Sequence, residues 1–115
     1  MADAFEERER ELEPHRVEEQ NRARMEVVDR LRDRGIPVNP GDDDVEVADL
    51  LDAVERFEAV VEAQGGDLFV NRIGSAEPQN PAFVLPEREP GESASDYRAT
   101  VIEATRVLRR GDRAD

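Results

Sequence analysis

The chain contains no lysine and no cysteine, only one histidine, and few aromatic residues. Without cysteine it can form neither disulfides nor thiolate nucleophiles, and the common structural zinc sites are excluded. It also has no apolar run of about 18 residues and no basic-then-apolar leader, so we expect neither a membrane span nor a secretory signal. A cytoplasmic location is therefore expected by default.

The residues that usually carry catalysis are also scarce. His15, the sole histidine, follows a proline in a highly charged stretch, and no cysteine or second histidine could complete a metal site with it. Ser75, Ser93 and Ser95 have no nucleophile elbow or triad around them, and there is no glycine-rich phosphate loop. We therefore expect no enzyme activity, no cofactor and no metal site.

Charge of one sign dominates instead. The chain has 29 carboxylates against 16 basic residues, all of them arginine, which gives a formal net charge of -13. Two explanations of this lysine-free composition stay open. A coding sequence rich in G and C favours arginine without selection on the protein, whereas a surface of carboxylates without lysine stems also keeps a protein hydrated and apart from its neighbours in concentrated salt. Both can hold together.

The acidity is concentrated in one part of the sequence. Residues 35–64 contain nine acidic residues and one arginine, whereas the first 34 residues are nearly balanced in charge. The acidic run at 42–46 lacks the spacing, the central glycine and the closing glutamate of a calcium loop, so we interpret it as helix capping and solvation. Direct nucleic-acid binding is not expected of a chain this acidic, with no basic stripe and no aromatic stacking platform.

Length and composition indicate one domain with a modest core. The chain has 115 residues, of which 37% are hydrophobic and 39% are charged, a balance between those of globular and disordered chains. We therefore expect a folded middle with loose ends. The predicted parts are a charged, partly ordered helical arm over 1–14, a single helical domain over 15–110 and a flexible tail over 111–115.

Capping signals and apolar periodicity predict three principal helices, near residues 15–34, 44–64 and 94–110. Pro14 should interrupt the first charged stretch, so that a new helical segment begins at His15. This helix has only a thin apolar stripe. It should end at Gly35 in the left-handed conformation, with Ile36 folding back onto Leu31.

The helix predicted over 44–64 has the clearest apolar face. Asp43 and Glu46 have the spacing of a capping box at its start, and Gly65 and Gly66 should end it. Apolar residues that alternate at spacings of three and four form a seam along it: Val47, Leu50, Val54, Phe57 and Val61. We expect this seam to pack against the protein's own first helix, with self-association as the alternative.

Residues 67–92 contain most of the prolines and two short apolar runs. The runs could pair as a short β-hairpin or lie as an extended arm over the helices. Phe69 and Phe83 are expected to be core anchors because so few aromatic residues must support the whole core. Ser93 and Asp96 should cap the last helix. The sequence thus predicts a mainly α fold, a small domain of about three helices with this arm between the last two.

Placing the seam inward turns four carboxylates of the same helix outward, and we call this set the acidic strip: Asp49, Asp52, Glu55 and Glu62. A merely solvated helix face would have the same pattern. The leading hypothesis is a small acidic adaptor that acts by protein–protein contact and binds a basic partner through the acidic strip, the arm at 67–92, or both. The alternatives are an acidic nucleic-acid mimic that inhibits a DNA-binding protein, and a homodimer built on the seam. A monomer is favoured.

Salt adaptation can be tested by thermal unfolding. If the acidic surface is adapted to salt, the unfolding midpoint should rise markedly from low to molar salt, because screening relieves repulsion that is concentrated in one helix. Circular dichroism at increasing salt measures this midpoint. A midpoint that does not respond to salt would leave codon usage as the sole explanation of the missing lysines.

Overall fold

A computed structural model describes the backbone of residues 2–114 and the side chains of residues 18–111. Its elements are three α-helices and one short 3₁₀ helix: α1 (Ala2–Asp33), α2 (Asp44–Ala63), η1 (Pro81–Phe83) and α3 (Ala94–Ala114). The mainly helical fold class is confirmed. The β-hairpin is not present, since the described chain contains no strand, and residues 64–93 consist of turns, irregular segments and η1.

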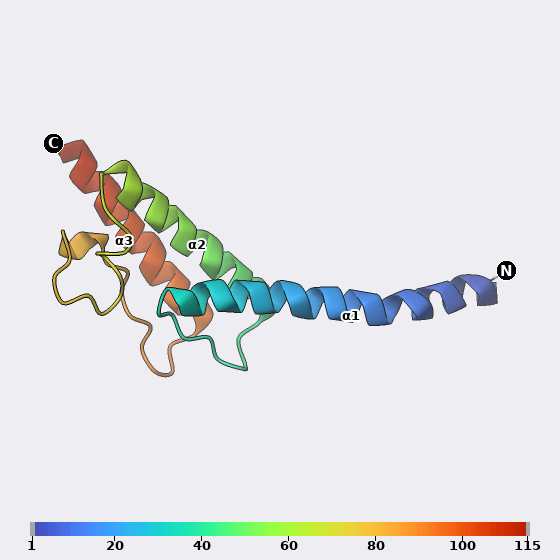
Figure 1. The fold of residues 1–115 in the computed structure, drawn as a ribbon. Helices are drawn as coiled ribbons and strands as arrows, with labels where there is room; N and C mark the ends of the chain where they lie inside the picture. Colours follow the sequence, from blue (N-terminus) through green and yellow to red (C-terminus); the bar gives the residue numbers. More distant parts are fainter. Residues whose placement is uncertain (1, 115) are drawn as a thin grey trace.

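The helices form a pair with a third helix crossing one end of it. Helices α2 and α3 lie side by side, whereas α1 meets this pair only through its C-terminal part and projects away from it (Figure 1). The molecule is therefore elongated, with dimensions of 67 × 28 × 23 Å. The loop between α2 and α3 folds back beside the end of α1 and covers the core there.

Every residue of the predicted seam is buried, so α2 faces inward as its periodicity indicates. The seam packs chiefly against α3, which contributes the buried side chains of Tyr97, Val101 and Leu108. The expectation that its main partner is the first helix is therefore wrong. Among its described side chains, helix α1 supplies Val28, Leu31 and the partly buried Val27 to the core, because the rest of its described surface is too polar to cover the length of α2.

The predicted end of the first helix is confirmed in detail. Gly35 has a φ of 82°, its N–H donates to the carbonyl of Arg32 at 2.9 Å, and the N–H of Ile36 donates to the carbonyl of Leu31 at 3.0 Å. This is a Schellman motif, and both Leu31 and Ile36 are buried in the core. The motif ends α1 sharply, so the chain can turn towards α2.

Two helix boundaries differ from the prediction. Helix α1 continues through Pro14 instead of restarting at His15. An interior proline removes one hydrogen bond and its ring crowds the preceding turn, which kinks a helix more often than it ends one. Helix α3 extends past residue 110 to Ala114 and passes through Gly111. A single glycine lowers helix stability by only about 1 kcal/mol, which does not suffice to end α3 there.

Both ends of α2 follow the predicted capping residues. The Asp43 carboxylate accepts a hydrogen bond from the N–H of Val45 at 3.0 Å, and a second Schellman motif joins Gly66 to the carbonyl of Val61 at 2.8 Å. A Cβ at Gly66 would lie 2.9 Å from Cδ2 of Phe83 and closer still to Val61. Glycine therefore lets the loop pack directly against the end of α2.

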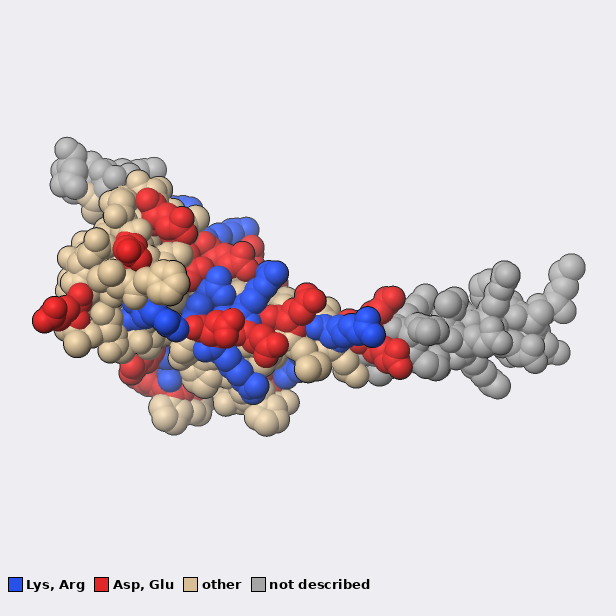
Figure 2. Space-filling view, in the orientation of Figure 1, with Lys and Arg blue, Asp and Glu red and all other residues tan. Residues whose placement is uncertain are grey.

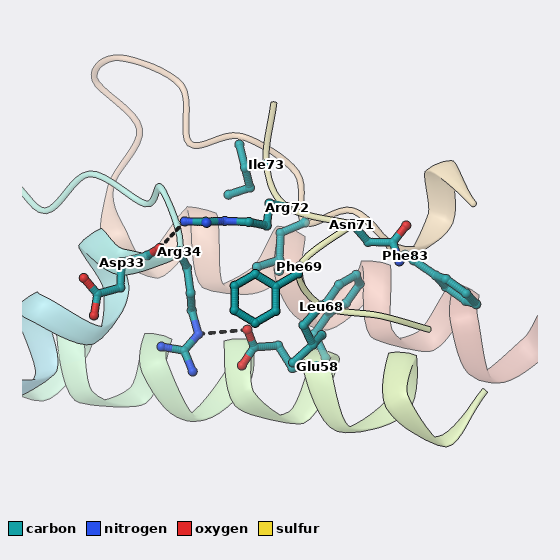
Figure 3. A pocket seen from close by; sticks show the side chains of 11 residues that line it. Asp33, Arg34, Glu58, Leu68, Phe69, Asn71, Arg72, Ile73 and Phe83 are labelled. Carbon is teal, nitrogen blue, oxygen red and sulfur yellow. Dashed lines mark hydrogen bonds and ion pairs between the residues drawn. The ribbon is translucent and has the colours of Figure 1, made fainter. Parts of the chain in front are cut away.

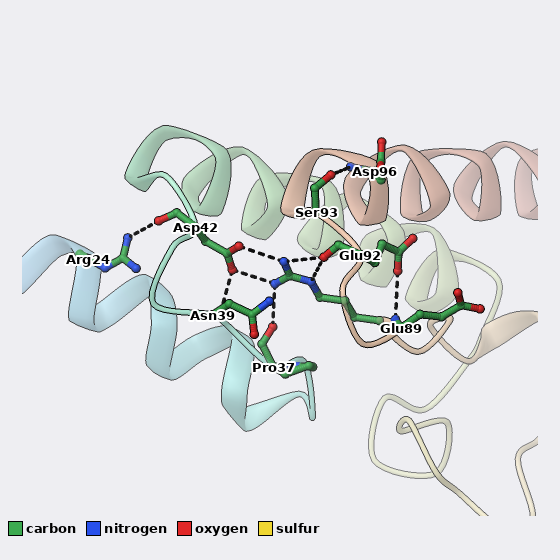
Figure 4. Close-up of polar contacts among 9 residues, drawn as sticks. Arg24, Pro37, Asn39, Asp42, Glu89, Glu92, Ser93 and Asp96 are labelled. Atoms are coloured by element: carbon green, nitrogen blue, oxygen red, sulfur yellow. Dashed lines mark hydrogen bonds and ion pairs between the residues drawn. The ribbon is translucent and has the colours of Figure 1, made fainter.

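A buried ion pair ties the two interhelical connections together. Arg88 donates two hydrogen bonds to the carboxylate of Asp42, at 2.8 and 2.9 Å, and further ones to the carbonyls of Pro37 and Glu92 (Figure 4). The Arg88 side chain is 1% exposed and that of Asp42 is 9% exposed. These hydrogen bonds from Arg88 hold the pKa of Asp42 below its usual value of 3.8.

The start of α3 is held against the same region. The Ser93 hydroxyl accepts from the N–H of Asp96 at 3.0 Å, which confirms the predicted cap. Four residues into α3, the buried Tyr97 hydroxyl donates to the carbonyl of Pro86 at 2.7 Å. Burial raises the pKa of Tyr97 to about 12, so this hydroxyl stays a hydrogen-bond donor at neutral pH.

Truncating the central aromatic residue of the seam should strongly destabilise the fold. Phe57 is 1% exposed, so Phe57→Ala should lower the free energy of unfolding by about 3 kcal/mol or more through lost burial and a new cavity. The control is Val45→Ala on the exposed side of α2, which should change it by less than about 0.5 kcal/mol. Urea denaturation measures both. Equal stability of the two variants would contradict the observed packing.

The buried ion pair should give the stability a defined pH dependence. Asp42→Asn leaves the Arg88 guanidinium buried without its carboxylate, and breaking such a pair costs about 3–5 kcal/mol. Because the pKa of Asp42 is lowered on folding, the pair stabilises fully above pH 3.8, and its contribution is lost as the pH falls through the lowered value. Denaturation of wild type and variant at a series of pH values should therefore show a constant difference near neutrality that shrinks below pH 3.8. A difference independent of pH would show that Asp42 does not titrate as proposed.

Candidate functional site

The four carboxylates of the acidic strip lie on the outer side of α2. Asp49, Asp52, Glu55 and Glu62 are all exposed, while the seam on the opposite side of the same helix is buried. The packing of the seam therefore fixes the rotation of α2 and holds the strip towards solvent. The structure brings the four residues onto one surface, as the helical spacing predicts.

Arginines interrupt this surface. Arg56 of α2 lies 3.1 Å from the carboxylate of Asp52, and Arg30 of α1 lies 3.9 Å from that of Glu55. Within residues 18–111 no ion pair forms at Asp49 or Glu62. Exposed ion pairs of this kind contribute at most about 1 kcal/mol, so an incoming cation can replace either arginine at little cost.

The three consecutive aspartates before α2 each have a structural role. Asp42 binds Arg88, Asp43 caps α2, and Asp44 pairs with Arg24 of α1. The interpretation of the acidic run as capping is confirmed for Asp43, whereas Asp42 and Asp44 form ion pairs with arginines, which the interpretation did not include. Among the described residues, no group of three or more His, Cys, Asp or Glu side chains is arranged to hold a metal ion. The side chain of His15 lies outside the described residues.

A second surface is formed by the loop after α2, and here the sequence-based expectation is wrong. Phe69, predicted as a core anchor, is 83% exposed, whereas Phe83 is half-buried and packs against the core. The reason is local. The Asp67 carboxylate accepts from the N–H of Phe69 at 2.8 Å, and this turn directs Leu68 towards the core and Phe69 away from it.

Hydrogen bonds between side-chain amides hold this loop in place. The buried Asn71 amide donates to the Asp67 carbonyl at 2.7 Å and to the Gln79 side chain at 2.9 Å. The Asn71 side chain in turn accepts from the N–H of Gln79 at 2.9 Å, and the Gln79 side chain accepts from the N–H of Asp67. These hydrogen bonds therefore fix the conformation of the loop that carries Phe69. The Asp-Leu-Phe order at 67–69 is the sequence signal that could have indicated its orientation.

Next to Phe69 the surface contains a pocket of about 260 Å³. The walls are mostly apolar and come from α2, the loop and η1: Phe57, Leu68, Ile73, Phe83 and Leu85. At the mouth, Phe69 stands near charged side chains from both sides of the pocket (Figure 3). An apolar hollow beside an exposed aromatic ring is a feature typical of binding surfaces.

The charges around the pocket balance one another. Arg34, at the end of α1, donates to the Glu58 carboxylate at 2.9 Å, and this hydrogen bond raises the pKa of Arg34 above its ordinary value. Arg72 of the loop donates to the backbone carbonyl of Asp33 at 3.0 Å. Red and blue side chains are likewise interleaved over the visible junction of α1 with the rest of the molecule (Figure 2).

Comparison of the chain with family models, with curated proteins and with solved structures finds no match. In the described part of the chain, no helix has both the length and the apolarity to cross a membrane. The functional argument therefore rests on the two surfaces, the acidic strip and the apolar pocket beside Phe69.

Proposed function

We propose that this protein is a small acidic adaptor that acts through protein–protein contact, without catalysis, and that a partner with a basic surface docks on the acidic strip. The observation that carries the proposal is the exposure of all four strip carboxylates on a helix whose opposite face is locked into the core. Because packing already fixes the conformation of this helix, a partner that binds it does not have to offset the entropy cost of ordering it.

The local charge supports a basic partner. Residues 35–64 combine nine acidic residues with one arginine, and the fold adds arginines from outside this segment to four of these acids. The strip itself has four carboxylates and only two paired arginines, so it keeps an excess of negative charge. A concentrated field of one sign attracts the opposite charge over several ångströms and raises the rate of encounter. The two arginines paired to the strip, Arg30 and Arg56, are themselves exposed, so a partner's guanidinium or ammonium group can displace them.

The same arginines argue against a nucleic-acid mimic. A surface that imitates a phosphate backbone needs an unbroken row of negative charge, because DNA-binding grooves are lined with cations. The chain instead carries 16 arginines, and two of them, Arg30 and Arg56, stand beside two of the four strip carboxylates. A homodimer built on the seam is also disfavoured, since the five seam residues are buried within one chain and offer no free face to a second copy.

The proposal predicts that the acidic strip controls association kinetics with a partner recovered by affinity capture. The variant Asp49→Asn, Asp52→Asn, Glu55→Gln, Glu62→Gln should fold normally, since all four side chains are exposed. It should associate more slowly and with a weaker salt dependence than wild type, while the dissociation rate changes less, because exposed charges act mainly on encounter. Surface plasmon resonance at two salt concentrations measures these rates.

A matched control separates the strip from the total charge. The variant Glu18→Gln, Glu19→Gln, Glu77→Gln, Glu87→Gln removes the same number of exposed carboxylates elsewhere on the molecule. It should keep most of the wild-type association rate. If the strip variant associates like wild type, or if both variants lose rate equally, the strip is only a solvated surface and the loop carrying Phe69 becomes the candidate contact.

A further inference from the structure

The surface around Phe69 has features that the proposed adaptor function does not use. An exposed aromatic side chain is common on protein surfaces when it stands alone. Phe69 does not stand alone, because it borders a pocket with walls of Phe57, Leu68, Ile73, Phe83 and Leu85. The loop that carries it is fastened by the Asn71 and Gln79 amides, so the ring and the hollow are held next to each other.

We propose that this surface is a weak self-association site, in which two copies of the chain meet about a two-fold axis and the Phe69 ring of each enters the pocket of the other. This inference goes beyond the proposed adaptor function and uses a different surface. A two-fold contact brings the same patch of both molecules together, so the patch must contain both a projection and a recess that fits it. Phe69 and the adjoining pocket meet that requirement.

The size of the pocket fits the occupant. An apolar cavity of about 150 Å³ is large enough to bind benzene. The pocket here is about 260 Å³ and is open to solvent, so its volume is sufficient for a phenyl ring. Transfer of an aromatic side chain from water to such a site is among the largest contributions that a single residue makes to an interface.

The charges at the mouth also fit a second copy. Four charged residues, two of each sign, are among those that line the pocket: Arg34, Arg72, Asp33 and Glu58. Asp33 accepts from Arg72 through its backbone carbonyl, and its carboxylate points away from Phe69 (Figure 3). The local charge is thus balanced in a chain whose formal net charge is -13, and the cations of one copy can face the anions of the other. A strongly acidic surface would repel its own copy, whereas this patch is neutral.

The seam offers no competing surface for dimer formation. The sequence favours a monomer because its periodic apolar face is expected to be used internally, and that face is indeed buried. The Phe69 patch is a separate apolar surface that consists of one exposed ring and one pocket. Stable complexes bury about 800 Å² per partner, and a contact through one ring and one pocket is expected to bury less. The expected complex is accordingly a weak dimer in equilibrium with the monomer.

Sedimentation velocity over a range of concentrations, at low and at molar salt, tests the proposal. Wild type should show a monomer–dimer equilibrium that shifts towards dimer in molar salt, because screening reduces the repulsion between two acidic molecules. Phe69→Ala should raise the dissociation constant by about tenfold or more, and Phe69→Asp should remain monomeric, since a carboxylate cannot be buried in the apolar pocket.

The matched control is Val45→Asp, which places the same charge at another exposed apolar residue, 67% exposed in the first turn of α2. It should dimerise like wild type. Circular dichroism melts should show that both aspartate variants are folded.

A wild type that stays monomeric at every concentration and at both salt concentrations overturns the proposal, even if the pocket then binds toluene or another protein. Dimerisation of Phe69→Asp at wild-type strength overturns it as well. A strip contact weakens with salt whereas this dimer strengthens, so the two proposals fail separately.

Discussion

Burial of the apolar face of α2 is the constraint on which the rest of the structure depends. This helix contributes seven of the fifteen buried hydrophobic residues in the described chain, so the other elements can bury their own thinner faces only against it. Helix α3 matches it along its length, with Tyr97, Val101 and Leu108. Helix α1 has too few apolar side chains to do the same and covers one end, and the rest of its length projects from the molecule.

Arginine side chains connect the segments that this small core leaves apart. Arg24 and Arg34 join α1 to the start and the middle of α2, Arg72 joins the loop to the end of α1, and Arg88 joins the two connections. A guanidinium group donates to several acceptors in one plane, and Arg88 uses this to bind a carboxylate and two carbonyls together. An ammonium group could not reproduce that geometry. The lysine-free composition therefore has a structural consequence whether it arose from codon usage or from salt.

The features predicted correctly from the sequence are those with local signals. The caps at Asp43 and Ser93, the Schellman motif at Gly35 and the inward seam all follow from residues within a few positions of one another. The predicted packing partner of the seam is wrong because both other helices have apolar faces. Which of them covers α2 depends on how far each apolar face extends along its helix. Phe69 was misplaced because its orientation depends on a turn at Asp67 and on amide contacts with Gln79, a residue distant in sequence. The acidic strip can be predicted from the helical spacing of its residues. The position of Arg30 beside Glu55 cannot, because it depends on how α1 packs against α2.

The two surfaces show how arginine placement can decide where an acidic protein is contacted. With 29 carboxylates in 115 residues, repulsion between copies is the default over most of the surface. Where Arg34 and Arg72 stand beside Glu58 and Asp33 the charges cancel, and there an apolar contact meets no local repulsion. Along the strip four carboxylates stand beside two arginines, which leaves an excess of negative charge there. The two proposals follow this difference: a different, basic protein is proposed to bind the strip, and a second copy of the chain is proposed to bind the apolar patch.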